Sequence, residues 1–581
     1  MGSVKAGTRP PWVGLGAAVW VQIAAGNAYN FPLYSHSLKS VLGFSQSQLT
    51  MIGVANDIGE NMGILPGLVC NRFPPWLMLL IGGLSCFLGY GVMWLSVSRT
   101  VQPLPYWLLW FALCIATNSS AWFSTAVLVT NMRNFPLSRG TVAGILKGYG
   151  GLSAAVFTEV YSTVLHHSSA NLLLFLAIGV PILCLLMMYF IKPCVPYTEE
   201  SSASHGNFVF TQAASVVLGF YLLITTALGD VFSVGVGNVT SIIYLAIMVF
   251  LLMAPLAIPI KMTFYPVNVS AAIHQKGITT SDSSDQLRQE FAADDDSTEP
   301  LLTPSVSTTS LGSFREPYDM SDVNMLLAVG EGAAMKKKRK PRRGEDFTFT
   351  EALCKADFWL LFFVYFVGVG SGVTVLNNLA QIGIAQGVRD TTILLSIFSF
   401  CNFVGRLGGG VLSEHFVRTR KVPRTLGMTV TQITMIFIYL LFAFALDGTL
   451  YIAAALLGIC YGVQFSIMIP TVSELFGLQN FGLFFNFISL GNPIGAFLFS
   501  GLLAGYLYDE EVNKQQHGLN LLASSSSACI GPNCFMLTFL ILAGLCVLGT
   551  ISSIILSVRI KPVYDMLYAD GSFRLPQPND H

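Results

Sequence analysis

Apolar runs of about 20 residues recur along this chain, and they restrict its fold more than any other feature. A helix of about 20 apolar residues is long enough to cross the hydrocarbon core of a bilayer. The first half of the chain contains eight such runs, at residues 12–34, 49–70, 76–97, 104–131, 141–165, 171–191, 208–228 and 240–260. The second half contains six, at residues 358–381, 391–413, 425–446, 450–475, 481–508 and 534–558. We therefore predict an all-α membrane protein with fourteen spans.

The seventh and eighth runs are the weakest candidates for spans. A glycine-rich stretch at 229–237 separates them, and the eighth run contains prolines. A re-entrant or interfacial pair is the alternative for these two runs, and it leaves twelve spans. The composition fits either number, because only 11% of the residues are charged, whereas a soluble protein carries about 25%.

The distribution of basic residues predicts the orientation in the membrane. Cytoplasmic loops are enriched in Lys and Arg, and most of the 31 basic residues lie on the same side as the N-terminus. We therefore expect both termini in the cytosol. The first apolar run is too long for the core of a signal peptide, so we also expect no cleavable signal peptide. The predicted parts are an N-terminal bundle at 1–261, a disordered cytosolic linker at 262–350, a C-terminal six-helix bundle at 351–560 and a cytosolic tail at 561–581.

The two halves of the chain share a pattern at the end of their second helix. In the first half, Gly67 and three further residues precede Asn71 and Arg72. In the second half, Gly410 and three further residues precede Glu414, with Arg418 close behind. Polar groups at equivalent helix ends of two bundles can join the bundles when one side of a central cavity is closed.

This pattern resembles the loop signature G-x-x-x-D-R-x-G-R-R of the major facilitator superfamily. The resemblance implies two six-helix bundles with about two extra helices here, and gating roles for Asn71, Arg72, Glu414 and Arg418. The first copy departs from the signature, because Asn71 replaces the acid and two prolines replace the downstream glycine and base.

A narrower resemblance covers nearly the whole chain. The stretches "GNAYNFPLYSHSLKSVLGFSQSQLTMIG", "NMRNFPLSRGTVAGILKGYGGLSAAVFTEVY" and "NNLAQIG" are similar to the plant nodulin-like branch, which includes the nuclear fusion defective type proteins. Its fungal relatives resemble monocarboxylate permeases, which hints at a carboxylate substrate. Family members carry Asp where this chain has Asn377, which argues against proton coupling at that position.

Two acids inside the second apolar run are the main site candidates. Asp57 and Glu60 are three residues apart and Asn61 is four from Asp57, so the three side chains share a helix face. Ionisable groups inside a membrane usually face the bundle interior and have a function. Substrate binding or proton transfer is one interpretation, and a structural network with Asn27 or Asn30 is the other.

Further polar residues inside spans are candidates for the same cavity. Lys147 and Arg406 are cations inside spans; Lys147 could instead reach toward the cytosolic surface, and Arg406 could serve the gate. The remaining candidates are Tyr149, Asn377, Asn378, Gln381 and Gln464.

Two short motifs lie in the linker. The basic run at 336–343 favours contact with anionic lipid, with a nuclear import signal as the alternative; we expect no nucleic-acid partner. Leu301 and Leu302 follow acidic residues and resemble an acidic dileucine signal, which would bind sorting adaptors and in plants often directs proteins to the vacuolar membrane. We expect a vacuolar or plasma membrane location.

Cys529 and Cys534 lie at the end of a predicted outer loop, where an oxidising compartment favours a disulfide.

The sequence contains no catalytic motif, so we do not expect an enzyme, and we expect no cofactor. The pair His166-His167 has no second set of ligands nearby in the sequence, so we do not expect a metal site. The leading hypothesis is that the protein lies in the lipid bilayer as a secondary active transporter for a small organic solute. Asp57 and Glu60 suggest that this transport is coupled to protons. The alternatives are a non-transporting membrane receptor or scaffold and, with less support, an ion channel.

Overall fold

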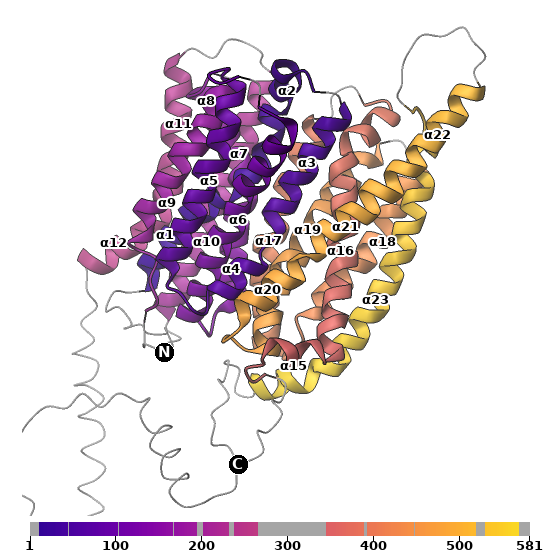
Figure 1. The fold of residues 1–581 in the computed structure, drawn as a ribbon. Helices are drawn as coiled ribbons and strands as arrows, with labels where there is room; N and C mark the ends of the chain where they lie inside the picture. Colours follow the sequence, from indigo (N-terminus) through magenta and orange to yellow (C-terminus); the bar gives the residue numbers. More distant parts are fainter. Residues whose placement is uncertain are drawn as a thin grey trace, which may run out of the picture. The chain divides into compact units, whose positions relative to one another are not determined.

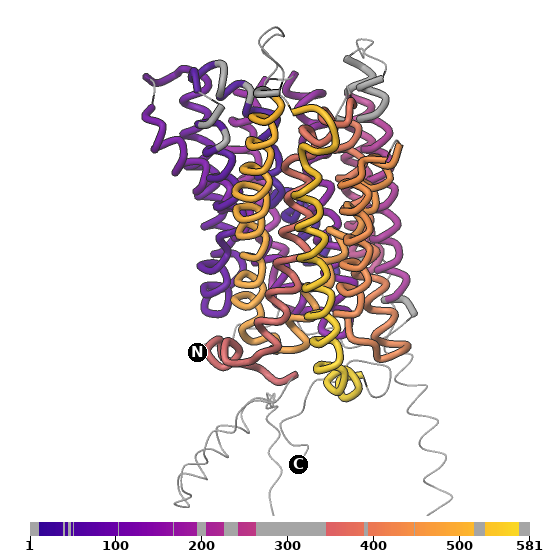
Figure 2. Tube along the Cα trace, turned by 90° about the vertical axis from the view of Figure 1, so that its right-hand side faces the viewer, coloured from indigo at the N-terminus to yellow at the C-terminus, as the bar shows by residue number. Residues whose placement is uncertain are grey.

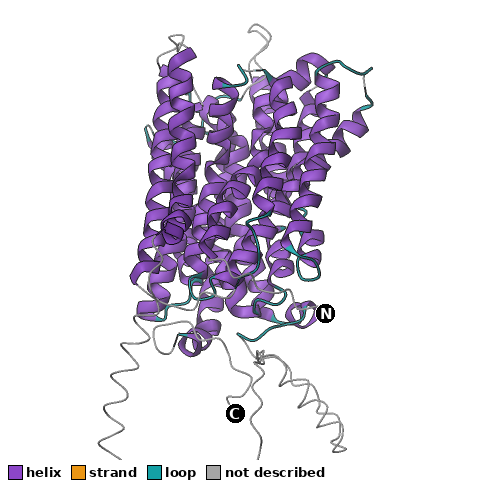
Figure 3. Cartoon of the chain, turned by 90° about the vertical axis from the view of Figure 1, so that its left-hand side faces the viewer, coloured by secondary structure: helices purple, strands orange, loops and turns teal. Residues whose placement is uncertain are grey.

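The computed structural model describes residues 11–44, 46–102, 104–166, 168–194, 202–231, 238–264, 344–388, 392–446, 448–518 and 529–568. Helices make up nearly all of this part of the chain (Figure 3). Leu301, Leu302 and the basic run at 336–343 lie outside the described residues.

The first half begins with two rods, and each of them contains a break. The first rod consists of α1 (Pro11–Ala24), the 3-10 turn η1 (Ala25–Asn30) and α2 (Phe31–Leu42), and the second of α3 (Gln46–Asn61) and α4 (Ile64–Val69). The other elements are α5 (Pro75–Val97), α6 (Tyr106–Asn134), α7 (Arg139–Thr163), α8 (Ser169–Leu174), η2 (Phe175–Gly179), α9 (Val180–Met188), α10 (Ser202–Val231), α11 (Asn238–Met253), η3 (Ala254–Leu256) and α12 (Ala257–Phe264).

The second half has one short helix followed by six long rods. Its elements are α15 (Phe349–Leu353), α16 (Ala356–Ala385), α17 (Thr392–Arg420), α18 (Thr425–Phe444), α19 (Thr449–Phe476), α20 (Phe481–Ser489), α21 (Gly491–Gly495), η4 (Ala496–Ala504), α22 (Gly505–Gly518) and α23 (Asn533–Leu567). The long helices of both halves run roughly side by side (Figures 1 and 2).

Eleven helices within the described ranges are long and apolar enough to cross a membrane. They include His205–Thr225 and Ile242–Met262, which correspond to the two weakest predicted spans. Three predicted spans, 12–34, 49–70 and 141–165, are not among the eleven. The first two contain helix breaks, and α7 carries Arg139, Lys147 and Glu159, which lower its hydropathy.

The two halves meet along α7 and α17. Glycine allows this approach: a Cβ on Gly410 would lie 2.6 Å from the carbonyl oxygen of Gly140 and 2.7 Å from the Cα of Gly144. Helix α10 corresponds to the seventh predicted run and is one of the extra helices inserted between the two six-helix bundles. It packs on both α7 and α17, and the ring centroids of Phe220 and Phe400 lie 5.1 Å apart. The insertion therefore covers this seam between the halves.

Two boundaries differ from the predicted ones. The chain is already packed at residue 344, before the predicted linker end at 350, because the main-chain N–H of Phe347 donates to the carbonyl of Phe476 at 3.2 Å. At the other end, α23 continues to Leu567, beyond the predicted tail boundary at 560, because Tyr564 and Leu567 are buried.

Candidate functional site

The two acids of the second rod lie just before the break between α3 and α4. Asp57 and Glu60 are partly buried. The Nδ2 of Asn56 donates to Asp57 Oδ1 at 3.4 Å, and Asn61 Nδ2 donates to the carbonyl of Asp57 at 3.0 Å. The Oδ1 of Asn61 accepts from Asn492 of α21 at 3.4 Å. The helix face predicted from spacing therefore reaches the second half.

Lys147 enters the same region from α7. Its Nζ donates to Ser124 Oγ on α6 at 3.0 Å and lies 5.2 Å from the ring centroid of Phe485 on α20. An ammonium group has three N–H donors, so this hydrogen bond leaves two. The lysine is oriented by these contacts toward the second half of the protein, not toward the surface.

Arg406 approaches from α17 and is 5% exposed. Its Nε donates to Asn402 Oδ1 at 3.1 Å, its Nη1 donates to the carbonyl oxygen of Lys147 at 3.4 Å, and its Cζ lies 4.8 Å from the ring centroid of Phe465. A guanidinium has five N–H donors, and two are used here. Its hydrogen bonds are made to Asn402 and Lys147, so the structure places Arg406 with Lys147 at the centre and not in the bond network of Glu414.

These four charged groups form one cluster, which we call the central cluster: Asp57, Glu60, Lys147 and Arg406. Glu60 is within electrostatic range of the other three. Among the residues that the structure describes, no ion pair within 4.0 Å joins any of the four to an opposite charge. Glu60 therefore lies within range of both cations and of Asp57, and none of the four closes into a salt bridge.

Two tyrosines lie near the central cluster. Tyr29 of η1 is within electrostatic range of Glu60 and Arg406 and is still 40% exposed. Tyr461 of α19 is in range of Arg406 and both acids. The only sequence signal for Tyr29 is its position between two asparagines in "GNAYN".

The other predicted site residues do not join the central cluster; several of them make hydrogen bonds within one half of the protein. Asn27 bonds Ser119 at 2.9 Å, Tyr90 at 3.0 Å and Ser120 at 3.3 Å, so it ties α5 and α6 to η1 and does not join the acids. Gln464 donates to Thr431 Oγ1 at 2.8 Å inside the second half. The remaining candidates differ in their surroundings. Asn30 and Tyr149 are buried, whereas Asn377 and Gln381 are exposed. The Nδ2 of Asn378 donates to Ser500 Oγ at 3.0 Å.

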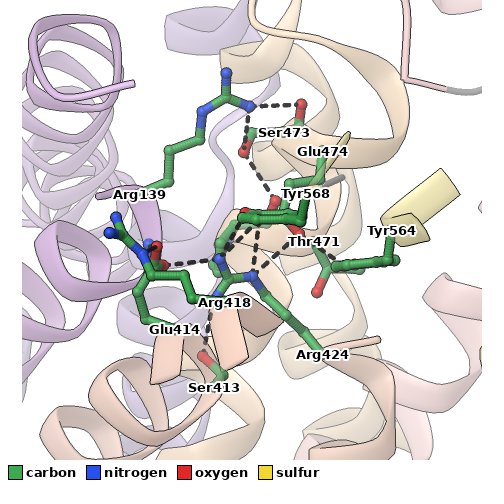
Figure 4. A network of polar contacts seen from close by, with 12 residues as sticks. Arg139, Ser413, Glu414, Arg418, Arg424, Thr471, Ser473, Glu474, Tyr564 and Tyr568 are labelled. Carbon is green, nitrogen blue, oxygen red and sulfur yellow. Dashed lines mark hydrogen bonds and ion pairs between the residues drawn. The ribbon is translucent and has the colours of Figure 1, made fainter. Parts of the chain in front are cut away.

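A second polar cluster joins the halves at the end of the bundle that carries Arg139 and Leu567; we call this the gate end (Figure 4). Glu414 Oε2 accepts from the main-chain N–H of Gly140 at 3.0 Å, and Arg418 Nη2 donates to the carbonyl of Leu137. Arg139 Nη1 donates to the carbonyl of Ser473 at 3.1 Å. All three bonds link the first half to the second.

A buried arginine organises the second-half side of this cluster. Arg424 pairs with Glu414 at 2.7 Å and with Glu474 at 2.8 Å. Tyr564 and Tyr568 each donate a hydroxyl hydrogen to Glu474, at 2.6 and 2.8 Å. The sequence pattern identified Glu414 and Arg418 but missed Arg424 and Glu474, because their partners are far away in the chain.

The first-half copy of the pattern uses a different cation from the one predicted. Asn71 Oδ1 accepts from Arg133 of α6 at 2.8 Å, whereas Arg72 is exposed. Arg133 also donates to the carbonyls of Leu478 and Gln479 in the second half, at 3.2 and 3.1 Å. In this structure Arg133, at the end of α6, makes the contact between halves at Asn71, and the gating role of Arg72 stays a prediction.

At the opposite end of the bundle, the structure joins Cys529 and Cys534 in a disulfide. Gln515 of α22 holds this loop through two bonds with Ile530, at 3.0 and 3.2 Å. The main-chain N–H of Gly531 donates to the carbonyl of Ala385 at 2.9 Å. The disulfide loop therefore connects α16, α22 and α23.

Among the described residues, no group of three or more His, Cys, Asp or Glu could hold a metal ion.

Comparisons with known proteins agree with this architecture. Residues 11–260 match the Nodulin-like family, and residues 345–566 match the family "NFD4, C-terminal domain". The chain is 30% identical over 568 residues to Protein NUCLEAR FUSION DEFECTIVE 4 of Arabidopsis thaliana, covering 96% of this chain and 90% of that protein. It is 23% identical to an uncharacterized membrane protein of Saccharomyces cerevisiae, covering 83% and 84%.

Among solved structures, a double-tryptophan mutant of XylE aligns with a TM-score of 0.50 at 11% identity, covering 95% of this chain and 98% of that one. At this identity the likeness concerns the fold alone. Taken with the two family matches and the Arabidopsis relative, it leads to one assignment: the chain belongs to the nodulin-like family and has the major facilitator fold.

Proposed function

We propose that the protein is a secondary active transporter that moves a small organic carboxylate together with a proton. The observation that carries the proposal is the pair of cations, Lys147 and Arg406, which come from different halves and have no carboxylate partner among the described residues. Unused donors on cations that are partly or fully shielded from water are costly unless an anion accepts from them. A substrate carboxylate can accept from both side chains at once, and Arg is well suited to such bidentate contacts.

Charge balance supports proton coupling. Without substrate, the two acids and two cations of the central cluster sum to zero. A bound carboxylate adds one negative charge inside the membrane, where an uncompensated charge costs on the order of 2.5–3.5 kcal/mol on insertion scales. A proton on Glu60 or Asp57 restores neutrality. The cluster therefore favours binding the substrate and a proton together.

The contacts between halves support alternating access. Secondary transporters bind solute near the midplane between two repeats that rock around it. Here the central cluster draws Glu60 and Lys147 from the first half and Arg406 from the second. The bonds of Arg139, Glu414 and Arg133 close the gate end. We propose that this gate end faces the cytosol, as do both termini, in the vacuolar or plasma membrane.

Counterflow in proteoliposomes tests the proposal. Vesicles loaded with one unlabelled carboxylate should accumulate the same labelled compound when they contain the protein, and Arg406→Gln should abolish this uptake. A panel of carboxylates, amino acids and sugars identifies the class. If sugars exchange and carboxylates do not, the substrate class is wrong; if no compound exchanges and none binds, the receptor or scaffold hypothesis replaces transport.

Protease added to one side of sealed vesicles tests the orientation. The linker at 262–350 should be cut from the cytosolic face and spared from the outer face. Cleavage only from the outer face would invert the orientation and place the gate end outside.

A further inference from the structure

A short segment just before the second half packs against the gate end. We call residues 344–348 the strap. The N–H groups of Gly344 and Phe347 donate to the carbonyls of Leu475 and Phe476 at 3.3 and 3.2 Å. These carbonyls belong to the last turn of α19, where helix carbonyls lack partners of their own. The strap therefore supplies hydrogen-bond donors to the last turn of α19.

The side chain of Phe347 anchors the strap. It is 2% exposed, its ring centroid lies 5.8 Å from that of Phe476, and Lys355 Nζ lies 5.7 Å from it. Burying a Phe side chain removes a large apolar surface from water and so stabilises the position of the strap. The strap is thus a fixed part of the second half, although it directly follows the long linker.

The strap also holds the loop between α19 and α20, residues 477–480. Asp346 Oδ1 accepts from the N–H of Gln479 at 3.0 Å, and the carbonyl of Phe347 accepts from Asn480 Nδ2 at 2.8 Å. Gly477 has φ +80°, and a Cβ there would lie 2.7 Å from the Cα of Asp346. Glycine is therefore required both by the backbone conformation and by the contact.

The other side of the same loop binds the first half. Arg133 donates to the carbonyls of Leu478 and Gln479, and Asn71 Nδ2 donates to Asn480 Oδ1 at 3.2 Å. Strap and first half are therefore attached to one loop of four residues from opposite sides.

A chain of oriented amides connects the two attachments. Arg133 can only donate, so Asn71 must present its oxygen to Arg133 and its nitrogen to Asn480. Asn480 then receives that bond on its oxygen and gives its own nitrogen to the carbonyl of Phe347, which can only accept. Each amide is fixed by its neighbours. Moving the strap removes the acceptor of Asn480 and disturbs the contact with Asn71.

We propose that the strap is a control element that sets how firmly the gate end is closed, so that events in the preceding linker regulate transport by tightening or releasing residues 344–348. The inference rests on the alternating access proposed above, and it adds a place where regulation acts. Release of the strap frees the loop 477–480, weakens its hold on Asn71 and Arg133, and shifts the protein toward the state with an open gate end.

The native thiol Cys70 reports on this gate. It is 7% exposed and lies against Gly482 of the second half, where a Cβ would approach its sulfur closely. Two further thiols serve as internal references: Cys354 is exposed and Cys184 is buried within the first half. Alkylation by N-ethylmaleimide, followed at each cysteine by mass spectrometry of the full-length protein in nanodiscs, therefore measures opening of the gate end separately from unfolding.

Two substitutions at one position give a matched pair. Asp346→Ala removes the acceptor for the Gln479 N–H, whereas Asp346→Asn retains an acceptor oxygen. We expect Asp346→Ala to raise the alkylation rate of Cys70 several-fold with Cys184 still protected, and Asp346→Asn to stay near the wild-type rate. Phe347→Ala, which removes the anchor, should act in the same direction as Asp346→Ala.

The proposal is overturned if Asp346→Ala and Phe347→Ala leave Cys70 as protected as in the wild type. It is also overturned if Cys184 becomes reactive in parallel, because the strap would then support the fold in general. The labelling needs no substrate, so its result is distinct from the transport test. Faster Cys70 labelling in a protein without counterflow would retain the strap and reject transport.

Discussion

The guanidinium of Arg406 on α17 donates to the main-chain carbonyl of Lys147 on α7, so the two cations of the central cluster are joined across the two halves of the protein. In the proposed mechanism, this contact would let a single bound anion touch both halves. A relative movement of α7 and α17 would then alter the geometry of the proposed anion site.

Arg406 should be sensitive to the shape of its side chain as well as to its charge. Arg406→Lys keeps the positive charge but cannot make both the Asn402 and the Lys147 bonds with a planar fork. We expect Arg406→Lys to lower substrate affinity by at least tenfold and Arg406→Gln to abolish transport, as measured by counterflow and by isothermal titration. Wild-type affinity in Arg406→Lys would exclude direct bidentate recognition.

The two acids should be needed for coupling and not for folding. We expect Asp57→Asn and Glu60→Gln to keep the wild-type melting temperature, because neither acid closes an ion pair among the described residues. Proton-driven uptake should fall in both variants, and the pH dependence of uptake should flatten in at least one. Aggregation of both proteins in size-exclusion chromatography would instead indicate the structural network considered as the alternative.

The close contact of glycines between α7 and α17 gives a test of the gate with a neighbouring control. Gly410→Ala places a Cβ against Gly140 and Gly144, whereas a Cβ on Gly408 meets no atom within 4 Å. We expect Gly410→Ala to expose Cys70 to maleimide and Gly408→Ala to leave it protected. Equal labelling in the two variants would contradict closure of the gate end through this contact.

Among the residues of the gate-end cluster, replacement of Arg424 should lower the stability of the fold the most. Arg424→Ala leaves Glu414 and Glu474 buried without their main cation, and breaking a buried pair in this way costs about 3–5 kcal/mol. A large drop in melting temperature is expected. Lys514→Ala, which breaks only exposed pairs with Glu510 and Glu511, should leave it unchanged. A small effect of Arg424→Ala would mean that the two carboxyl groups become neutral or hydrated.

The disulfide should contribute modestly. Cys529 and Cys534 are five residues apart, and so short a loop contributes less than the roughly 3 kcal/mol that chain entropy gives for a 15-residue loop. We expect Cys529→Ser to reach the membrane with a slightly lower melting temperature, and Cys354→Ser, a change at a free exposed thiol, to have no effect. Labelling of both wild-type thiols without prior reduction would show that no bridge forms in the membrane.

The fold was predictable from the sequence because apolar length and helical spacing are local properties. The same spacing placed Asp57, Glu60 and Asn61 on the face that reaches the second half. Tertiary partners were harder to predict. Arg424 pairs with Glu474 fifty positions away, and Arg133 contacts Asn71 because α6 returns its last turn to that residue. Gln464 and Asn27 were indistinguishable from cavity residues, since a buried amide that bonds within one half has the same sequence context as one that faces a solute.

The inserted helix α10 makes the two sides of the protein unequal. On its side, the seam between α7 and α17 is covered by protein, with Phe220 against Phe400. On the other seam, where α4 meets α20, Leu65 and Leu68 are exposed. The two seams between the halves therefore present different surfaces to the surrounding lipid: α10 lies over one of them, and exposed leucine side chains of α4 lie at the other.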